Sequence, residues 1–566
     1  MDKRWLKRAE PPQEQVEQLS HAINVNFCLS AILIQRGIED FDTARKFFRP
    51  ELSHLHDPFL MQDMEAAVAR LRKAIEENER IMIYGDYDVD GTTAVSLVYN
   101  YLQNFYTNCE VYIPDRYAEG YGVSLAGIEW AEQSKCGLII ALDCGIKSSE
   151  LVSIAKLKGI DFVICDHHLP DDNIPKAVAV LDPKRKDCFY PFKELSGCGI
   201  GFKLMQAYAQ RYRDETEVFE YLDLVAVSIA SDIVPIVDEN RVLTHFGLKK
   251  LNENPGPGLQ ALKDIAVIKN DLDVSGIIFT LGPRINAAGR VAHARGAVEL
   301  LTARTEEEAN ALAEKINIKN DLRKQFDSDI TEEAIAMIEG DLSMRTAKST
   351  VLFKNTWHKG VIGIVAARCV EKYYRPTVIL TESNNKITGS ARSVVGFDLY
   401  NAILECSDLL EKFGGHKYAA GLTLDVQNLE LFQRRFEEVV SSSITEDMLT
   451  PMIDIDMPLS FNVISPKFLN VLKQMAPFGP ENPRPIFEAE NVYVFNALSS
   501  FKDKHVRFLA GQDGSDNVFP VVGFDMIEHY DRLSKRDIFK MVFTVEENTF
   551  NGTTSIQLRI KDIKFL

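Results

Sequence analysis

The chain has 566 residues, 46% of them hydrophobic and 26% charged, and its formal net charge is −18. This length excludes a single hydrophobic core and predicts three or more domains, and the sequence has no apolar run of the about 18 residues that a membrane span needs. The acidic balance excludes a protein that holds nucleic acid by overall positive charge, so a nucleic-acid enzyme of this charge needs a local basic groove, bound cations or both.

The first half of the chain is predicted to be helical and then to form a parallel α/β sheet. We expect an N-terminal helical segment over 1–75, which includes an amphipathic helix from residue 64. Short apolar strands at 81–84, 138–142 and 162–165 then alternate with helical stretches. This alternation is typical of a parallel sheet, so we expect an α/β domain over 76–245 with its ligands at the carboxyl ends of the strands.

The second half is predicted to contain a connector and two further domains. The connector, 246–342, includes one long helix over 305–338, which begins at a Thr305–Glu308 capping box. Its apolar stripe recurs every four residues: Leu322, Phe326, Ile330, Ala334 and Ile338. A smaller α/β domain follows over 343–450. Short strands with Gly, Asn and Asp turns over 451–566 predict a β-barrel of the OB type.

Three carboxylates directly follow the first predicted strand. Asp86, Asp88 and Asp90 alternate in YGDYDVDG. Taken alone, this run is equally consistent with an Asp-rich turn that caps a helix. Carboxylates this close repel one another unless cations neutralise them, so the run also fits a metal site.

Polar side chains recur where later strands end. Asp143 follows the strand at 138–142, Asp166, His167 and His168 follow the strand at 162–165, and we expect Asp232, in SIASDIVP, at a further strand end. A lone histidine is usually a core or surface residue, but two in succession after an aspartate are less often accidental. Carboxylates with one imidazole suit Mn²⁺ or Mg²⁺, and two such ions can clamp a phosphate. The set predicts hydrolysis of a phosphoester or phosphoanhydride.

Four blocks in this order, YGDYDVDG, LDCG, DHH and SDIVP, resemble the motifs of the DHH phosphoesterase superfamily. Four further blocks, LGPRINAAGR, WHKGVIGIVAAR, GSARS and GGHKYAAG, resemble its single-strand-specific 5′→3′ exonucleases. The resemblance spans nearly the whole chain. It implies a DHH catalytic domain over 76–245, a DHH-associated nucleotide-binding domain over 343–450 and an OB-like domain over 451–566. It also implies release of 5′-mononucleotides from single-stranded DNA, with two Mn²⁺ or Mg²⁺ ions, in DNA repair and recombination.

The resemblance implies a role for each metal ligand. Asp143 would bridge the two ions. Asp90, His167 and Asp232 would complete the shell of one ion, and Asp88 would hold much of the other together with waters.

The remaining residues of the motifs receive supporting roles by the same resemblance. Other branches of the superfamily carry a histidine where this chain has Tyr84, and Asp86 would replace it as a metal ligand. His168 would contact the scissile phosphate, and Asp166 would orient both histidines.

Substrate-binding residues are expected outside the metal site. Taken singly, each arginine is more often a surface ion pair, but several lie among glycines and alanines that let a phosphate backbone approach. By resemblance, Ser390 and Arg392 would hold the 5′-terminal phosphate together with Arg116, and His416 would line the nucleotide site. The full set of candidates is Arg116, Arg284, Arg290, Arg368, Ser390, Arg392, Gly414, Gly415 and His416.

Two other interpretations remain open. A smaller-substrate phosphodiesterase, acting on short oligoribonucleotides or cyclic dinucleotides, would share the metal motifs and the GGH block. A catalytically silent DNA-binding scaffold is disfavoured because every metal ligand is present.

The nine cysteines contain no Cys-x-x-Cys pair and favour a reducing compartment, so we expect a cytoplasmic location. The resemblance suggests a monomer whose partners, besides single-stranded DNA, are a repair helicase and a single-strand-binding protein.

Overall fold

The computed structural model describes residues 3–383, 385–550 and 552–566. The chain divides into two compact units. The small unit holds Arg284–Gly296 and Ala311–Met452 with the N-terminal end of the chain, and the large unit holds Trp5–Pro283, Ala297–Asn310 and Ile453–Leu566. Among the residues described, no helix combines the length and the apolar character that crossing a bilayer requires.

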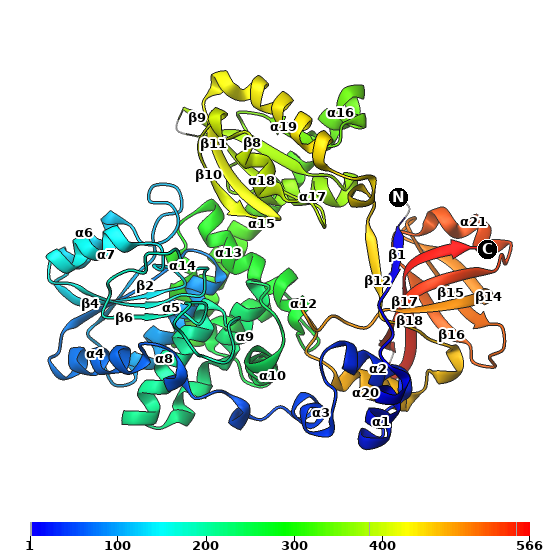
Figure 1. The fold of residues 1–566 in the computed structure, drawn as a ribbon, viewed down its shortest axis with the longest axis horizontal. Helices are drawn as coiled ribbons and strands as arrows, with labels where there is room; N and C mark the ends of the chain where they lie inside the picture. Colours follow the sequence, from blue (N-terminus) through cyan, green and yellow to red (C-terminus); the bar gives the residue numbers. More distant parts are fainter. Residues whose placement is uncertain (1–2, 384, 551) are drawn as a thin grey trace. The chain divides into compact units, whose positions relative to one another are not determined.

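The large unit contains a five-stranded, fully parallel sheet in the order β3-β2-β4-β5-β6. Its strands are β2 (Arg80–Gly85), β3 (Cys109–Tyr112), β4 (Cys136–Leu142), β5 (Asp161–Cys165) and β6 (Ala179–Leu181). Helices cover both faces (Figure 1): α6 (Leu125–Gln133) and α7 (Ser149–Leu157) on one, and α4 (Met64–Glu76), α5 (Val89–Gln103) and α8 (Gly197–Tyr212) on the other. The predicted parallel α/β domain is therefore confirmed.

One element of this region differs from the prediction. Asp232 does not follow a strand: it ends helix α9 (Leu222–Ser231), and its amide donates to the Ser228 carbonyl at 2.9 Å. Nearly every residue of α9 is buried. A helix that is apolar on all sides shows no helical periodicity, so its sequence cannot be distinguished by pattern from a buried strand.

The small unit contains a mixed five-stranded sheet in the order β10-β11-β9-β8-β7. Its strands are β7 (Thr350–Phe353), β8 (Thr377–Ser383), β9 (Lys386–Arg392), β10 (Leu410–His416) and β11 (Ala419–Leu424). One face packs on α18 (Leu399–Leu404) and α19 (Leu429–Ser443), and the other packs on α17 (Ile362–Tyr373). The second α/β domain expected from the sequence is present.

The predicted long helix is α15 (Glu306–Gly340). Ile330, Ala334 and Ile338 are buried in one cluster with residues of α17, as the stripe predicts. Leu322, which belongs to the same stripe, is 43% exposed. The four-residue spacing therefore marks the buried face correctly only over the last turns of the helix.

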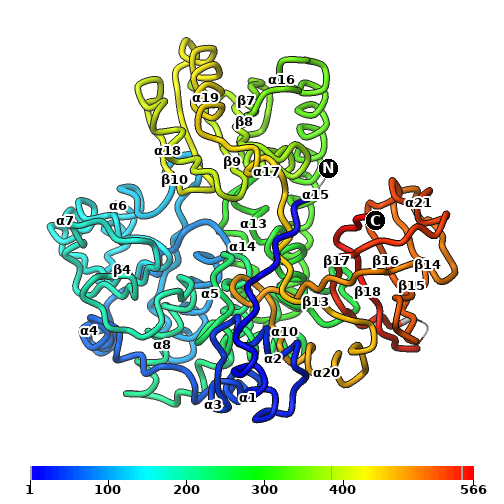
Figure 2. Tube along the Cα trace, turned by 45° about the vertical axis from the view of Figure 1, so that its right-hand side comes forward, coloured from blue at the N-terminus to red at the C-terminus, as the bar shows by residue number. Residues whose placement is uncertain are grey.

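The C-terminal strands of the large unit close into a barrel, as predicted. Figure 2 shows these strands in orange and red. The hydrogen-bonded order β14-β15-β16-β18-β17 is closed by pairing of β14 with β17. The strands are β14 (Phe487–Phe501), β15 (His505–Gln512), β16 (Phe519–Gly523), β17 (Phe539–Phe550) and β18 (Thr553–Phe565). Closure removes the exposed sheet edges that would otherwise pair with other chains.

The N-terminal helices α1 (Gln13–Ile23) and α2 (Phe27–Gln35) contribute to the core of this barrel domain. Val16, Leu19 and Ile32 belong to the same buried cluster as Phe487 and Phe543. Segments from the two ends of the sequence thus build one hydrophobic core.

A buried arginine connects this core to the helices behind the parallel sheet. Arg241, on α10 (Asp238–Glu253), donates hydrogen bonds to the carbonyls of Phe47, Met475 and Ala476 at 2.9–3.0 Å. Its guanidinium lies 3.7 Å from the centre of the Phe47 ring. One side chain therefore satisfies backbone acceptors from two distant segments.

Candidate metal centre

The carboxyl ends of adjacent strands bring the motif residues of the large unit together. Asp86 follows β2, Asp143 follows β4 and His167 follows β5 closely, and these strands are neighbours in the sheet. Their ligand atoms form three groups, each within 4.8 Å: Asp143 with His167 and His168; Asp90 with His167 and Asp232; and Asp86 with Asp88 and Asp143. Asp143 and His167 each belong to two groups, so the three form one continuous cluster.

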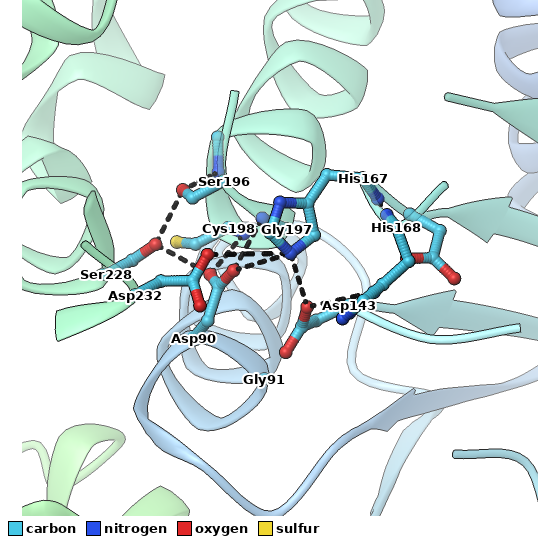
Figure 3. A network of polar contacts seen from close by, with 12 residues as sticks. Asp90, Gly91, Asp143, His167, His168, Ser196, Gly197, Cys198, Ser228 and Asp232 are labelled. Atoms are coloured by element: carbon cyan, nitrogen blue, oxygen red, sulfur yellow. Dashed lines mark hydrogen bonds and ion pairs between the residues drawn. The ribbon is translucent and has the colours of Figure 1, made fainter. Parts of the chain in front are cut away.

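His167 lies at the centre of this cluster. Its Nε2 is 3.2 Å from Asp143 Oδ1, 3.6 Å from Asp232 Oδ2 and 3.7 Å from Asp90 Oδ2 (Figure 3). Burial lowers the pKa of His167, which favours the neutral ring with a free lone pair. A neutral imidazole directed at three carboxylates is suited to share a cation with them.

The carboxylates of the cluster lie buried or partly buried and repel one another. Burial, followed by the charges of Asp90 and Asp88, raises the pKa of Asp143 well above its usual range. The same causes raise the pKa of Asp232 to about 9. Asp86 Oδ2 is buried and has no hydrogen-bond partner among the described residues. Oxygen donors with one imidazole fit Mn²⁺ or Mg²⁺, whose charge would offset this repulsion.

Close packing of α8 against Asp143 shapes the site. A Cβ atom at Gly197 would lie 2.5 Å from the Cβ of Asp143, so only glycine permits this approach. The first turn of α8 then reaches Asp90: Gly197 N donates to Asp90 Oδ2 at 2.7 Å and Cys198 N donates to Asp90 Oδ1 at 2.8 Å (Figure 3). The helix N-terminus thereby places its free amides on a carboxylate of the cluster.

Asp166 supports the second histidine. Its Oδ1 accepts hydrogen bonds from the amides of His167 and His168 and lies 2.8 Å from His168 Nδ1. Its Oδ2 accepts from the amide of Ile146. Burial acts against ionisation of Asp166, but the hydrogen bond and charge of His168 lower its pKa overall. Tyr121, which is not among the predicted site residues, places its hydroxyl 3.0 Å from His168 Nε2.

The small unit brings the GSARS and GGH blocks onto one face of its sheet. Residues of three neighbouring strands stand in register: Ser390 beside Gly421 and Gly414, and Arg392 beside Ala419 and His416. These two rows are two residues apart, so their side chains point to the same face. The result is a row of small residues with Ser390 and Arg392 on one side and His416 on the other.

The N-terminus of α17 also lies at Ser390 and Arg392. Arg392 Nη1 donates to Ser390 Oγ at 3.1 Å. A Cβ atom at Gly363, in the first turn of α17, would lie 2.8 Å from Ser390 Oγ and 3.0 Å from Arg392 Nη2. Gly363 was not among the predicted residues, although it belongs to the block WHKGVIGIVAAR.

The other predicted arginines occupy separate positions. In the large unit, the Arg116 guanidinium lies 4.8 Å from the centre of the Tyr87 ring. In the small unit, Arg284 Nε donates to Asn317, Arg290 Nη1 donates to the Gly360 carbonyl, and Arg368 forms an ion pair with buried Asp327 at 2.7 Å. Arg368 therefore forms an ion pair within the protein, which is the more common role of a single arginine near the surface.

Family models match three segments of the chain: the N-terminal domain of the DHH family over 80–229, the DHHA1 domain over 346–442 and the RecJ OB domain over 455–562. The single-stranded-DNA-specific exonuclease RecJ of Bacillus subtilis is 34% identical over 565 residues, which cover 99% of this chain and 70% of that protein. Its counterpart from Salmonella typhimurium is 32% identical and covers 89% of this chain and 90% of that protein. The chain belongs to the RecJ family.

Solved structures agree with this RecJ-family assignment. The structure of RecJ with Mn²⁺ from Thermus thermophilus matches with a TM-score of 0.85, covering 99% of this chain and 79% of that chain, and at 24% identity it confirms the fold. An exonuclease RecJ bound to manganese is 28% identical with a TM-score of 0.60, covering 70% of this chain and 98% of that chain. The chain is a metal-dependent hydrolase of the nuclease class.

Proposed function

We propose that this RecJ-family chain is a single-stranded-DNA-specific 5′→3′ exonuclease that uses two Mn²⁺ or Mg²⁺ ions and releases 5′-mononucleotides. The observation that carries this proposal is a continuous cluster at the carboxyl end of the parallel sheet, in which Asp90, Asp143 and Asp232 surround His167 and Asp86 and Asp88 join through Asp143. Relatives named for this substrate align with the chain over most of its length.

The metal ligands divide naturally between two ions. Asp90, His167 and Asp232 would hold one, and Asp86 and Asp88 the other. Asp143 shares one group with Asp86 and Asp88 and another with His167, so it is the proposed bridging ligand. Two divalent ions, when bound, activate water and offset the charge of the scissile phosphate. The chain itself contributes the placement of these ligands, whose atoms lie within 4.8 Å of one another in each group.

His168 is the proposed contact of the scissile phosphate. Burial disfavours its protonated form, but the hydrogen bond and charge of Asp166 raise its pKa overall. The ring is therefore disposed to hold a proton and to offer a charge-assisted hydrogen bond to a phosphate oxygen.

The surface formed by Ser390, Arg392 and the N-terminus of α17 is the proposed binding site of the 5′-terminal phosphate. A guanidinium, a hydroxyl and free helix amides are the donors that an anionic group requires. His416, with neighbouring Gly414 and Gly415 on the same strand, would line the site of the terminal nucleotide. A phosphate bound at the chain end, rather than along the backbone, accounts for an exonuclease acting from the 5′ end.

The same proposal includes the setting of the enzyme. Arg116, Arg284, Arg290 and Arg368 would also contact the DNA substrate, and a repair helicase and a single-strand-binding protein would be partners of the enzyme. We propose that the chain acts as a monomer and in the cytoplasm.

The test is digestion of oligonucleotides labelled at either end, single- or double-stranded, with Mn²⁺ or with a chelator. The expected result is metal-dependent loss of single strands as mononucleotides from the 5′ end. Equal cleavage of double strands would contradict the substrate selectivity. Competition by excess cyclic dinucleotide or diribonucleotide distinguishes the alternative: if these block DNA hydrolysis and are themselves cleaved faster, the chain is a small-substrate phosphodiesterase.

A further inference from the structure

Ser228 lies inside helix α9, one turn before Asp232, and contacts two residues of the metal centre. Its side chain is fully buried. Its hydroxyl lies 2.6 Å from Asp90 Oδ1, and its carbonyl accepts the amide of Asp232 at 2.9 Å. Neither the sequence motifs nor the relatives' names assign this residue a role.

A second hydroxyl continues the network. Ser196, which caps α8, lies 2.6 Å from Ser228 Oγ, and its own Oγ accepts the amide of Gly199 at 3.1 Å (Figure 3). A hydroxyl has one proton to donate, and a carboxylate has none. If Ser228 donates to the Asp90 carboxylate, its Oγ must accept from Ser196. The direction of all three bonds follows: Gly199 N–H to Ser196, Ser196 O–H to Ser228, and Ser228 O–H to Asp90.

These bonds determine which lone pairs of Asp90 remain free. The two carboxylate oxygens offer about four acceptor positions. Oδ1 accepts from Cys198 N and from Ser228, so both of its positions are used. Among the described residues, Oδ2 accepts from Gly197 N alone, and this is the oxygen that lies 3.7 Å from His167 Nε2. Asp90 therefore has one position left, and it is on the oxygen that faces the other ligands.

We propose that Ser228, oriented by Ser196, is a positioning residue that restricts Asp90 to one metal-binding oxygen and holds that oxygen towards His167 and Asp232. This inference rests on the proposed two-metal function and specifies how one of its ligands is held. Without the Ser228 hydroxyl, Oδ1 regains a lone pair that can compete for the ion, and only the two amides of α8 still orient the carboxylate. The ion bound through Asp90 is then held less firmly.

The test is a titration of the metal-free full chain with Mn²⁺. The electron paramagnetic resonance signal of free Mn²⁺ measures how much of the ion stays unbound. The wild-type chain is expected to bind two ions. Ser228→Ala is expected to bind one of them about 10- to 100-fold more weakly, the usual loss when the support of a metal ligand is removed. The spectrum of Mn²⁺ bound to Ser228→Ala should also differ from that of Mn²⁺ bound to the wild type, because the Asp90 oxygens that bind the ion change.

Ser231→Ala is the matched control. Ser231 is on the same helix, directly before Asp232, and its buried Oγ has no hydrogen-bond partner within the described part of the chain. This variant removes a hydroxyl beside the site without touching Asp90, so it should bind Mn²⁺ as the wild type does. Equal weakening in both serine variants would overturn the positioning role, because a general disturbance of α9 would explain it.

Ser196→Ala tests the second hydroxyl of the network. It keeps the Ser228 hydroxyl but removes the group that donates to it, so Mn²⁺ affinity should fall by less than in Ser228→Ala. Circular dichroism checks that each variant folds, and alanine favours helix over serine at position 228. Unchanged affinity and spectrum in Ser228→Ala, with two ions bound by the wild type, would overturn the inference alone. A wild-type chain that binds no Mn²⁺ would overturn the proposed function itself.

Discussion

Asp143 is a residue of the site whose negative charge is strongly disfavoured by its surroundings. It is buried, its pKa is raised by burial and by the charges of Asp90 and Asp88, and its backbone φ is +58°. Left-handed backbone at a non-glycine residue is uncommon and costs free energy that the surrounding packing must offset. Such unfavourable features occur mainly at functional sites. A bound cation would relieve the repulsion, so they indicate that Asp143 binds a metal ion.

Asp143→Asn is predicted to abolish activity and leave the fold intact. Asparagine has the same shape and tolerates left-handed backbone, but it binds cations weakly. Hydrolysis of single-stranded DNA should fall by more than about 100-fold, the upper range for residues that only support a metal ligand. The melting temperature in chelator should not fall, because a repelled charge is removed. Asp516→Asn, an exposed carboxyl of the barrel, is the control; near-normal rates in Asp143→Asn would contradict the assigned centre.

Asp232 predicts a pH dependence of stability in the metal-free chain. Its pKa is raised from 3.8 to about 9 in the folded state. Between these values the folded state keeps a proton that the unfolded state has released, so the free energy of unfolding falls as pH rises. Thermal melts in chelator should show a shallower decline for Asp232→Asn than for the wild type over this window. Parallel curves would show that Asp232 ionises normally.

Arg392→Ala is predicted to remove the preference for 5′-phosphorylated ends. Hydrogen bonds to a charged group contribute about 1.5–3 kcal/mol, so the ratio of rates on 5′-phosphate and 5′-hydroxyl ends should fall about 10- to 100-fold. Arg435→Ala is the matched control, since Arg435 forms a surface ion pair between α19 and Asp408. An unchanged ratio in Arg392→Ala would place the phosphate elsewhere.

The sequence predicts the charged residues of the metal centre but not the residues that hold or pack against the site residues. Asp86, Asp143 and His167 stand directly after recognisable strands, so their meeting follows from parallel topology alone. Ser228 and Gly363 belong to helices, and their contacts arise from how those helices pack. No local pattern distinguishes them from ordinary small residues.

The helices show how far periodicity can be used. In α15 the stripe gives the correct face where the helix packs on α17, but it extends to exposed Leu322, so the spacing alone does not show where burial begins. In α9 burial on all sides removes the pattern, and Asp232 was therefore expected on a strand. In the parallel sheet, β2, β4 and β5 are predicted because short apolar runs before polar turns have few other interpretations, whereas the short strands β3 and β6 are not predicted.

Ile338→Ala is predicted to destabilise the small unit. Ile338 is fully buried with Ile330 and Trp357, so the substitution leaves a cavity that costs about 2–5 kcal/mol. Leu322→Ala on the same helix should cost less than about 1 kcal/mol, because Leu322 is 43% exposed. Urea denaturation followed by circular dichroism compares the two. Similar costs would mean that both ends of the stripe are equally packed.

Over the whole chain, the kinds of fold follow from the helix and strand patterns of the sequence, but the sharing of cores does not. The N-terminal helices were expected as a separate segment, and their apolar faces complete the barrel core. Sequence patterns show that a face must be buried; they do not show which distant segment buries it.

Arg241→Ala is predicted to weaken the connection between the barrel and the helices behind the parallel sheet. It would leave the carbonyls of Phe47, Met475 and Ala476 without this donor, at about 1–3 kcal/mol for each one that stays dry. A loss of at least about 3 kcal/mol in urea denaturation and faster proteolysis of the barrel are expected. Arg211→Ala removes a surface ion pair with Glu65 and should cost less than about 1 kcal/mol. Equal effects would show that the Arg241 contacts are dispensable.

The shared barrel core has a consequence for biosynthesis. Helices α1 and α2 are translated first, whereas the strands they pack against come last. At ordinary elongation rates the interval is on the order of tens of seconds, during which apolar helix faces have no native cover. Nascent chains stalled before the barrel should therefore bind chaperones at their N-terminal helices, and a barrel fragment expressed from residue 451 onwards should aggregate unless those helices are supplied as a separate peptide.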